Sequence, residues 1–142
     1  DIDHFKQLND RCGHPVGDAA LERVARILDG TVRRVDTVAR VGGEEFVVLM
    51  PDTADEQAEH VARRVVAGVL RNRHTLSDGT VVSVGVSAGL AVYPTDGRTS
   101  AHLLGAADAA MYAAKRTGGR QVERSRAPLS MEPAPAVVPA AS

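Results

Sequence analysis

The stretch RVGGEEFVVLM, Arg40 to Met50, decides how this chain is expected to fold. A β-rich run, Thr37 to Val41, ends at the two glycines, and a second run, Phe46 to Met50, follows the two glutamates. Glycine supplies the positive φ that tight hairpin turns require, so the stretch predicts two antiparallel strands joined across Gly42 to Glu45. Paired glutamates are unusual there, because turns favour Asn, Asp or Gly. On this segment alone, two solvated surface acids and a functional acid pair are both open readings.

Amphipathic helices are predicted on both sides of this hairpin. From Val16 to Arg33, apolar residues recur at steps of three and four, which gives one apolar helix face with Asp18 in its first turn. After the hairpin, Thr53 and Glu56 have the spacing of a capping box, and the helix they begin is expected to run to about Leu70.

A long alternating run and a final helix complete the pattern. Asp78-Gly79 predicts a hairpin turn, and the run 82–92 that follows alternates apolar and small residues, so its small face could accommodate a closely packed helix. Ser100 is expected to cap the last helix, which Gly118 and Gly119 end. Helices that alternate with hairpins predict an α+β fold with one mixed or antiparallel sheet.

The composition describes one soluble globular domain. The chain has 142 residues, a formal net charge of −1 and one cysteine, Cys12. Near-neutral charge argues against a broad phosphate-backbone surface, so no nucleic acid is expected as a partner. A lone cysteine excludes a disulfide framework, and no stretch approaches the ~18 apolar residues of a membrane span. Residues 125–142 are rich in Pro, Ala and Ser and predict a disordered C-terminal tail after a domain at 1–124.

Acidic residues also gather at the start of the chain, in Asp1-Ile2-Asp3. Magnesium takes oxygen ligands, often one or two carboxylates completed by water and substrate phosphates, so this segment could hold such an ion. The more common situation is a solvated strand end whose aspartates cap a helix.

Three motifs, in this order, resemble the GGDEF-type diguanylate cyclase family: DIDHFKxxND at 1–10, GHPVGD at 13–18 and the GGEEF variant at 42–46. Further matches lie at 87–89 and 107–115, and the resemblance covers residues 1 to about 122. It implies an α+β sandwich in which helices flank a central, mostly antiparallel five-stranded sheet, similar to the palm of nucleotide cyclases and polymerases. Family members have a helix and a core strand before the first motif, so we expect both to precede Asp1.

The resemblance implies that two GTP molecules are condensed into cyclic di-GMP and two pyrophosphates at a homodimer interface. Two Mg²⁺ ions per active site, with Mn²⁺ as an alternative, are implied as cofactors. The implied metal ligands are the Asp1 carboxylate, the Ile2 carbonyl and Glu44. Glu44 is also implied to help deprotonate the attacking hydroxyl, and Glu45 is the second candidate catalytic acid. Asp3 is expected to be structural, through helix capping or orientation.

Substrate recognition is implied at two groups of residues. Guanine would be read by Asn9, His14 and Asp18, and the phosphates would be bound by Phe5 and Lys6 at a helix start and by Lys115 on the last helix. Taken alone, Asn9 and Asp18 could be capping residues, and Lys115 could compensate a helix dipole.

Two further features concern regulation and a departure from the family. Arg33 and Asp36 have the separation of the family's inhibitory RxxD site, which binds the product cyclic di-GMP. The family commonly has an arginine, which reaches phosphate, where this chain has Gly119. Either Arg120 or Arg116 replaces it, or one phosphate contact is lost.

The leading hypothesis is an active diguanylate cyclase domain with an upstream sensor domain in its parent chain. The alternatives are a catalytically inactive module that binds GTP or cyclic di-GMP, and a related cyclase acting on one triphosphate. A cytoplasmic location is expected, and a membrane anchor in the parent protein is left open.

Overall fold

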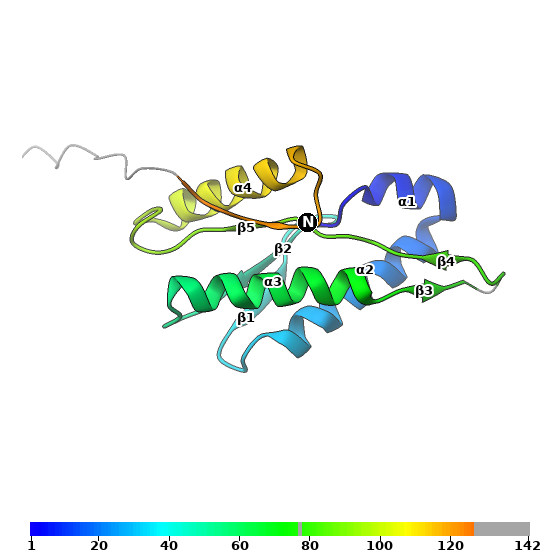
Figure 1. Cartoon of the computed structure of the whole chain (residues 1–142), viewed down its shortest axis with the longest axis horizontal. Coiled ribbons are helices and arrows are strands. Elements are labelled where there is room, and N and C mark those ends of the chain that lie inside the picture. The colour runs from blue at the N-terminus through cyan, green and yellow to red at the C-terminus, as the bar shows by residue number, and fades with distance from the viewer. Residues whose placement is uncertain (77, 127–142) are drawn as a thin grey trace, which may run out of the picture.

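The computed structural model describes residues 1–76 and 78–126 (Figure 1). Four helices and six short strands make up this part of the chain: α1 (Phe5–Cys12), α2 (His14–Thr31), β1 (Thr37–Arg40), β2 (Phe46–Leu49), α3 (Asp55–Arg71), β3 (His74–Thr75), β4 (Val81–Val82), β5 (Ala88–Leu90), α4 (Ser100–Arg116) and β6 (Val122–Arg124). The predicted tail lies almost wholly outside the described residues, of which only Ser125 and Arg126 belong to it.

The helices lie on both sides of the central strands. Strands β5 and β6 run between α4 on one side and α3 on the other, while α2 packs on α3 and α1 packs on α2 (Figure 1). The buried core is mainly aliphatic and draws on all these layers, with Ile2, Leu21, Val24, Val69 and Val86 among its members. Burial of such side chains supplies the main driving force for folding. The predicted α+β class is confirmed.

The strands pair in three separate two-stranded sheets within the described residues, rather than in one ladder of five. β1 and β2 are antiparallel, as are β3 and β4, whereas β5 and β6 are parallel. The predicted run 82–92 is divided, because the strand pairing of residues 83–87 with the chain start is limited to the isolated antiparallel bridge Ile2–Val86. This one bridge is too short to join the flanking pairs into a continuous sheet.

Helix α2 begins two residues earlier than predicted, at His14. Gly13, with φ 85°, separates it from α1, and Pro15 occupies one of its first positions, where the missing N–H costs nothing. Asp18 therefore lies in the second turn, and the prediction that it belongs to the first turn was wrong. A capping role for Asp18 is excluded by the same shift.

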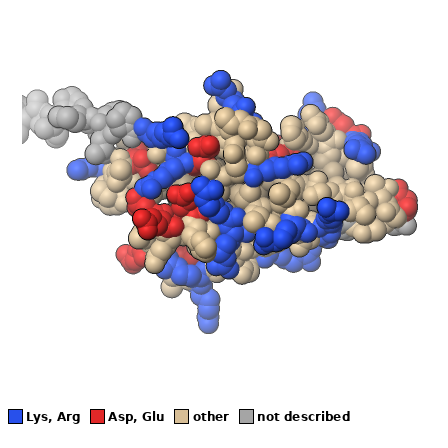
Figure 2. Space-filling view, viewed as in Figure 1, with Lys and Arg blue, Asp and Glu red and all other residues tan. Residues whose placement is uncertain are grey.

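The N-caps of α3 and α4 each lie one position away from the predicted residues, Thr53 and Ser100. The N-cap of α3 is Ala54, without a side-chain hydrogen bond, because the Thr53 hydroxyl donates to the Pro51 carbonyl at 2.9 Å and accepts from Arg33. The N-cap of α4 is Thr99, whose Oγ1 accepts from the His102 N–H at 3.2 Å. Figure 2 shows acidic side chains gathered over the N-terminal end of α3 and basic ones over its C-terminal half, which suits the helix dipole.

The close helix packing predicted for the small-residue face is found at Gly89. A Cβ built on Gly89 would lie 1.9 Å from the Ala107 carbonyl oxygen and 2.4 Å from the Met111 nitrogen. Only a residue without a side chain lets the backbone of α4 approach β5 so closely. This contact fixes the position of the helix that carries Lys115.

Candidate active site

The chain start lies between two other segments. The Ile2 N–H donates to the Glu44 carbonyl at 3.2 Å, which ties the middle of Asp1-Ile2-Asp3 to the hairpin tip. On its other edge, the Asp3 N–H donates to the Gly85 carbonyl at 2.9 Å. Ile2 is fully buried, so its side chain anchors this junction in the core. The structure therefore brings together the two acidic segments that the sequence singled out separately.

Helix α4 contributes a cation at the same place. Lys115 Nζ lies 2.5 Å from Asp1 Oδ1, and the Asp1 side chain is only 7% exposed. A carboxylate removed from water to this degree needs a partner, because an unpaired buried charge is strongly unfavourable. Lys115 supplies that partner from the last turn of α4.

Asp3 joins the chain start to the loop after α4. Its carboxylate accepts from Ser87 Oγ at 2.7 Å and from the Arg120 N–H at 2.9 Å, and Ser87 is fully buried. The structural role expected for Asp3 is thus observed, although as a link between segments and not as a helix cap, since the N-cap of α1 is His4. Sequence reasoning gave no role to the buried hydroxyl of Ser87.

The two candidate replacement arginines occupy different surroundings. Arg120 has φ 59°, which is uncommon for a residue with a long side chain, and Asp3 holds its N–H. Its side chain lies over Gly85, where a Cβ would come within 2.5 Å of Arg120 Cγ. Arg116 is exposed in the last turn of α4, and among the described residues its side chain makes no hydrogen bond or ion pair with the chain start. Arg120 is therefore the arginine that shares a surface with Asp3.

The hairpin tip is shaped by Arg40, which the sequence analysis did not single out. Arg40 Nε donates to the Gly42 carbonyl at 3.1 Å and Nη2 donates to the Gly43 carbonyl at 2.9 Å. Neither glycine has a positive φ, so that prediction was wrong. At Gly42 a Cβ would lie 2.4 Å from Glu45 Oε2, an atom at the end of a flexible side chain that can move away. No local sequence signal marks an arginine as the partner of carbonyls two and three residues ahead.

The beginning of α1 has the properties of a ligand-facing backbone. His4, its N-cap, has φ 58° in the left-handed region, and strained residues of this kind concentrate at functional sites. The Phe5 side chain is buried in the core, so only its backbone can face a ligand, while Lys6 is exposed.

Asn9 packs on Gly17, the residue before Asp18, at the corner between α1 and α2. The Asn9 side chain lies against Gly17, where a Cβ would lie 1.9 Å from Oδ1. Within the described residues, that buried Oδ1 has no hydrogen-bond partner. An unpaired buried amide oxygen is costly and calls for an explanation such as a ligand. His14 is exposed at the start of α2.

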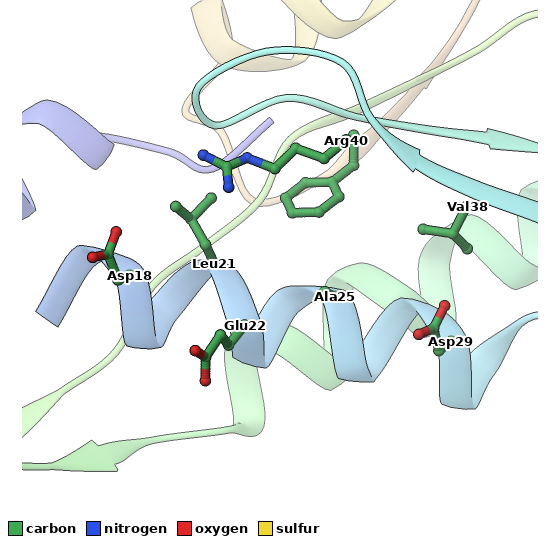
Figure 3. Close-up of a pocket in the computed structure, with 8 residues that line it drawn as sticks. Asp18, Leu21, Glu22, Ala25, Asp29, Val38 and Arg40 are labelled. Atoms are coloured by element: carbon green, nitrogen blue, oxygen red, sulfur yellow. The ribbon is translucent and has the colours of Figure 1, made fainter. Parts of the chain in front are cut away.

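Asp18 also marks one end of a groove between α2 and the hairpin, with a volume of about 500 Å³ (Figure 3). Figure 3 shows the Arg40 side chain extending along the hairpin side of this groove, above Leu21 in that view. The lining residues are Asp18, Leu21, Glu22, Ala25, Asp29, Val38, Arg40 and Phe46. Three of these are acids on α2, and their helical spacing was a signal that the sequence analysis did not use.

The donor set at the junction fits a hard divalent cation. Asp1 and Glu44 supply carboxylates and Ile2 supplies a carbonyl, all oxygen ligands of the type that Mg²⁺ or Mn²⁺ prefers. Within residues 1–76 and 78–126, no three His, Cys, Asp or Glu side chains form a ready-made metal cage. An ion here would take its remaining ligands from water and phosphate, as Mg²⁺ commonly does.

Arg33 and Asp36 form a separate ion pair below the hairpin. Arg33 Nη2 lies 2.9 Å from Asp36 Oδ1, the Arg33 N–H donates to Asp36 Oδ2 at 2.7 Å, and Nη2 also donates to the Pro51 carbonyl at 2.9 Å. The Arg33 side chain is 49% exposed, whereas that of Asp36 is 1% exposed. The hydrogen bond from Arg33 lowers the pKa of Asp36 and raises the pKa of Arg33 itself.

The folded chain matches known proteins. A family model described as "Diguanylate cyclase, GGDEF domain" matches residues 1–121, and the chain belongs to this family. It is 44% identical over 117 residues to diguanylate cyclase TpbB of Pseudomonas aeruginosa, covering 82% of this chain and 27% of that protein. As the resemblance implied, the class of enzyme in this family is the diguanylate cyclase, and its members use a divalent metal.

Solved structures agree with this assignment. The GGDEF domain of DgcB from Caulobacter crescentus, in complex with c-di-GMP, superposes with a TM-score of 0.83 at 31% identity, covering 89% of this chain and 75% of that one. The active GGEEF domain of a diguanylate cyclase from Vibrio cholerae gives a TM-score of 0.80 at 29% identity, covering 89% and 80%.

The chain spans only 27% to 34% of the length of the first curated relatives it matches. Within the described residues, no helix is long and apolar enough to cross a membrane.

Proposed function

We propose that this chain is the catalytic domain of a diguanylate cyclase and that two copies condense two GTP molecules into cyclic di-GMP. The observation that carries the proposal is the convergence of three distant segments. Asp1-Ile2-Asp3, the Glu44 backbone and Lys115 meet through the Ile2–Glu44 hydrogen bond of 3.2 Å and the Lys115–Asp1 ion pair of 2.5 Å. Such a site offers carboxylates for metal and a cation for phosphate, which is what phosphoryl transfer requires.

The reaction divides between two facing domains. In each half, a bond forms between the 3′-oxygen of one GTP and the α-phosphorus of the other, while the bond from that phosphorus to the β-phosphate oxygen breaks and pyrophosphate leaves. Glu44 helps to remove the proton of the attacking hydroxyl, and Glu45 is the second acid in reach of the turn. Because one domain holds only one GTP, a homodimer is needed for turnover.

Asp1, Ile2 and Glu44 would hold the metal, for which we propose two Mg²⁺ ions per site, replaceable by Mn²⁺. When bound, the metal neutralises phosphate charge and lowers the pKa of the attacking hydroxyl. Arg40 holds the carbonyls of Gly42 and Gly43 and thereby orients the turn that presents both glutamates.

The remaining residues orient the nucleotide. Asp18, His14 and Asn9, with its unpaired buried Oδ1, can pair with a guanine edge. The backbone of Phe5 at the start of α1 donates N–H groups to phosphate, and Lys6 and Lys115 add positive charge.

Product inhibition is proposed at Arg33 and Asp36. Half of the Arg33 side chain is exposed, and its planar guanidinium can bond a guanine edge or a phosphate of cyclic di-GMP. The GTP supply places the reaction in the cytoplasm, and segments of the parent protein outside this chain would carry the sensor.

The alternative is an inactive domain that binds GTP or cyclic di-GMP. It is disfavoured because Asp1, Glu44 and Glu45 are all retained. The deciding experiment incubates the dimerised full-length protein with GTP and Mg²⁺ and follows pyrophosphate and nucleotide products. We expect cyclic di-GMP from the native protein, none from Glu44→Ala, and normal amounts from Glu56→Ala, an exposed acid in the first turn of α3. Binding of GTP without any product would refute the proposal in favour of the inactive module.

A further inference from the structure

The ion pair between Lys115 and Asp1 places a positive charge on a proposed metal ligand. Nζ and Oδ1 are 2.5 Å apart, which is short even for a charge-assisted hydrogen bond. The Asp1 side chain is 7% exposed and that of Lys115 is 34% exposed. The lysine thus covers the carboxylate and remains partly open to solvent itself.

A metal ion bound to Asp1 and the Lys115 ammonium would be two cations at one carboxylate. The metal coordinates oxygen directly, at about 2.0–2.1 Å for Mg²⁺, so on either oxygen of the Asp1 carboxylate it would lie close to Lys115 Nζ. Because two cations at one carboxylate repel each other, metal binding to Asp1 weakens the Lys115–Asp1 ion pair and favours displacement of the lysine.

We propose that Lys115 is the internal counter-ion of Asp1 and is transferred from Asp1 to the substrate phosphates when the metal binds. The inference rests on the proposed function, because it takes Asp1 as a metal ligand. In the metal-free protein the lysine neutralises the buried carboxylate. In the loaded protein the metal takes over that task, and the released ammonium binds the phosphates that arrive with the metal.

The surroundings allow the lysine to move while its helix stays in place. Thr117 Oγ1 donates to the Ala113 carbonyl at 3.0 Å, and Gln121 Nε2 donates to the Ala114 carbonyl at 3.0 Å, so the end of α4 is held by side-chain hydrogen bonds. Asp3 holds the following loop through the Arg120 N–H. Lys115 itself has a flexible four-carbon stem, so rotation of its side chain is sufficient for the transfer.

Two thermodynamic consequences follow. Metal alone binds weakly, because it must break an ion pair and leave the lysine without a partner. Triphosphate provides that partner, so metal and nucleotide strengthen the binding of each other by the same factor, as linkage requires. Lys115 therefore opposes metal binding in the absence of nucleotide and favours it in its presence.

The test is a titration of the full-length protein with Mn²⁺ alone, in which the electron paramagnetic resonance signal reports free Mn²⁺. Lys115→Gln removes the charge, and we expect it to bind Mn²⁺ about tenfold more tightly than the native protein, with no nucleotide present. Arg116→Gln is the matched control, since this neighbouring exposed cation does not contact Asp1, and its affinity should equal that of the native protein. Lys115→Met provides a second neutral variant, should Lys115→Gln fail to fold.

A second titration uses 3′-deoxy-GTP, which lacks the attacking hydroxyl and cannot react. Here we expect the effect of the substitution on affinity to reverse, so that Lys115→Gln binds the metal–nucleotide complex at least tenfold more weakly than the native protein. Equal or weaker Mn²⁺ binding by the neutral variants without nucleotide would overturn the inference. Lys115→Gln could strengthen the binding of Mn²⁺ alone and weaken the binding of the metal–nucleotide complex while the native protein forms no cyclic di-GMP. In that case the proposed function fails and the transfer of Lys115 stands.

Discussion

Gly89→Ala should separate α4 from β5, and its cost can be worked out from the contacts of the glycine. The added Cβ would lie 1.9 Å from the Ala107 carbonyl oxygen and 2.4 Å from the Met111 nitrogen. An ordinary carbon–oxygen contact is about 3.4 Å, so α4 would have to retreat by roughly 1.5 Å. Both clashing atoms belong to backbone and cannot rotate away.

Overpacking of this kind costs about 1–3 kcal/mol, and we expect the upper end or more because a whole helix must shift. The assay is urea unfolding followed by far-ultraviolet circular dichroism, since α4 is one of four helices in the described residues. Gly105→Ala is the control on the same helix: nothing lies within 4 Å of its added Cβ, and it should stabilise the protein by about 1 kcal/mol.

The two variants add the same methyl group, but the expected changes in the free energy of unfolding have opposite signs. If Gly89→Ala unfolds within about 0.5 kcal/mol of the native protein, the close approach of α4 to β5 is not what the glycine provides. If both variants destabilise equally, the cost lies in α4 itself and the packing argument is refuted.

Three further predictions concern the ligand sites. Arg33→Ala should raise the concentration of cyclic di-GMP that halves turnover by at least about tenfold, because charge-assisted contacts are lost; unchanged inhibition would remove this site. The lowered pKa of Asp36 means that its bond to Arg33 stabilises the fold above the ordinary carboxyl range and that this contribution is lost as the pH falls through the lowered value. The melting temperatures of the native protein and Asp36→Asn should therefore differ at pH 7 and converge toward pH 3, whereas a constant difference contradicts the assignment. Arg120→Ala should raise the KM for GTP about tenfold with little change in kcat, while Arg116→Ala should leave both unchanged; the reverse pattern would make Arg116 the phosphate ligand.

Local patterns predicted α2, α3, α4 and the first hairpin well, because their signals lie within the elements themselves, whereas α1 was expected only as a helix start implied by the family resemblance. The β-rich runs around Gly42 to Glu45 produced the expected antiparallel pair, with Val38 opposite Val48. Turn chemistry likewise placed Gly79, whose φ is 83°. The strand pairing of both segments agrees with the short-range preference of the backbone, although neither Gly42 nor Gly43 has the predicted positive φ.

Features that depend on distant partners were not predictable in this way. Thr53 and Ser100 have good capping chemistry, yet the Thr53 hydroxyl is taken by Arg33 and Pro51, and Thr99 reaches His102 first. The alternation over 82–92 predicted one strand, but alternation records burial on one face and says nothing about how many partners the backbone finds.

The site residues also divide into those that sequence patterns identified and those whose roles depend on distant partners. Asp1, Glu44 and Lys115 were identified through family motifs, because nothing in the spacing of residues 1, 44 and 115 predicts that they meet. Arg40 and Ser87 were missed since their roles consist of bonds to backbone carbonyls and to the carboxylate of Asp3, which leave no local trace. Periodicity could have revealed Glu22 and Asp29 as neighbours of Asp18 on the groove side of α2.

The same few contacts hold the fold and position the chemistry. Gly89 lets α4 approach β5, and that approach sets the distance from which Lys115 reaches Asp1. Asp3 fixes the loop after α4, so Arg120 and Lys115 share one anchored helix end. A change that shifts α4 by an ångström must therefore alter metal and phosphate binding together, even when it touches no ligand. For this reason, stability and nucleotide affinity should fall in parallel across substitutions at the α4–β5 contact, while Gly105→Ala, on the exposed face of α4, should leave nucleotide affinity unchanged.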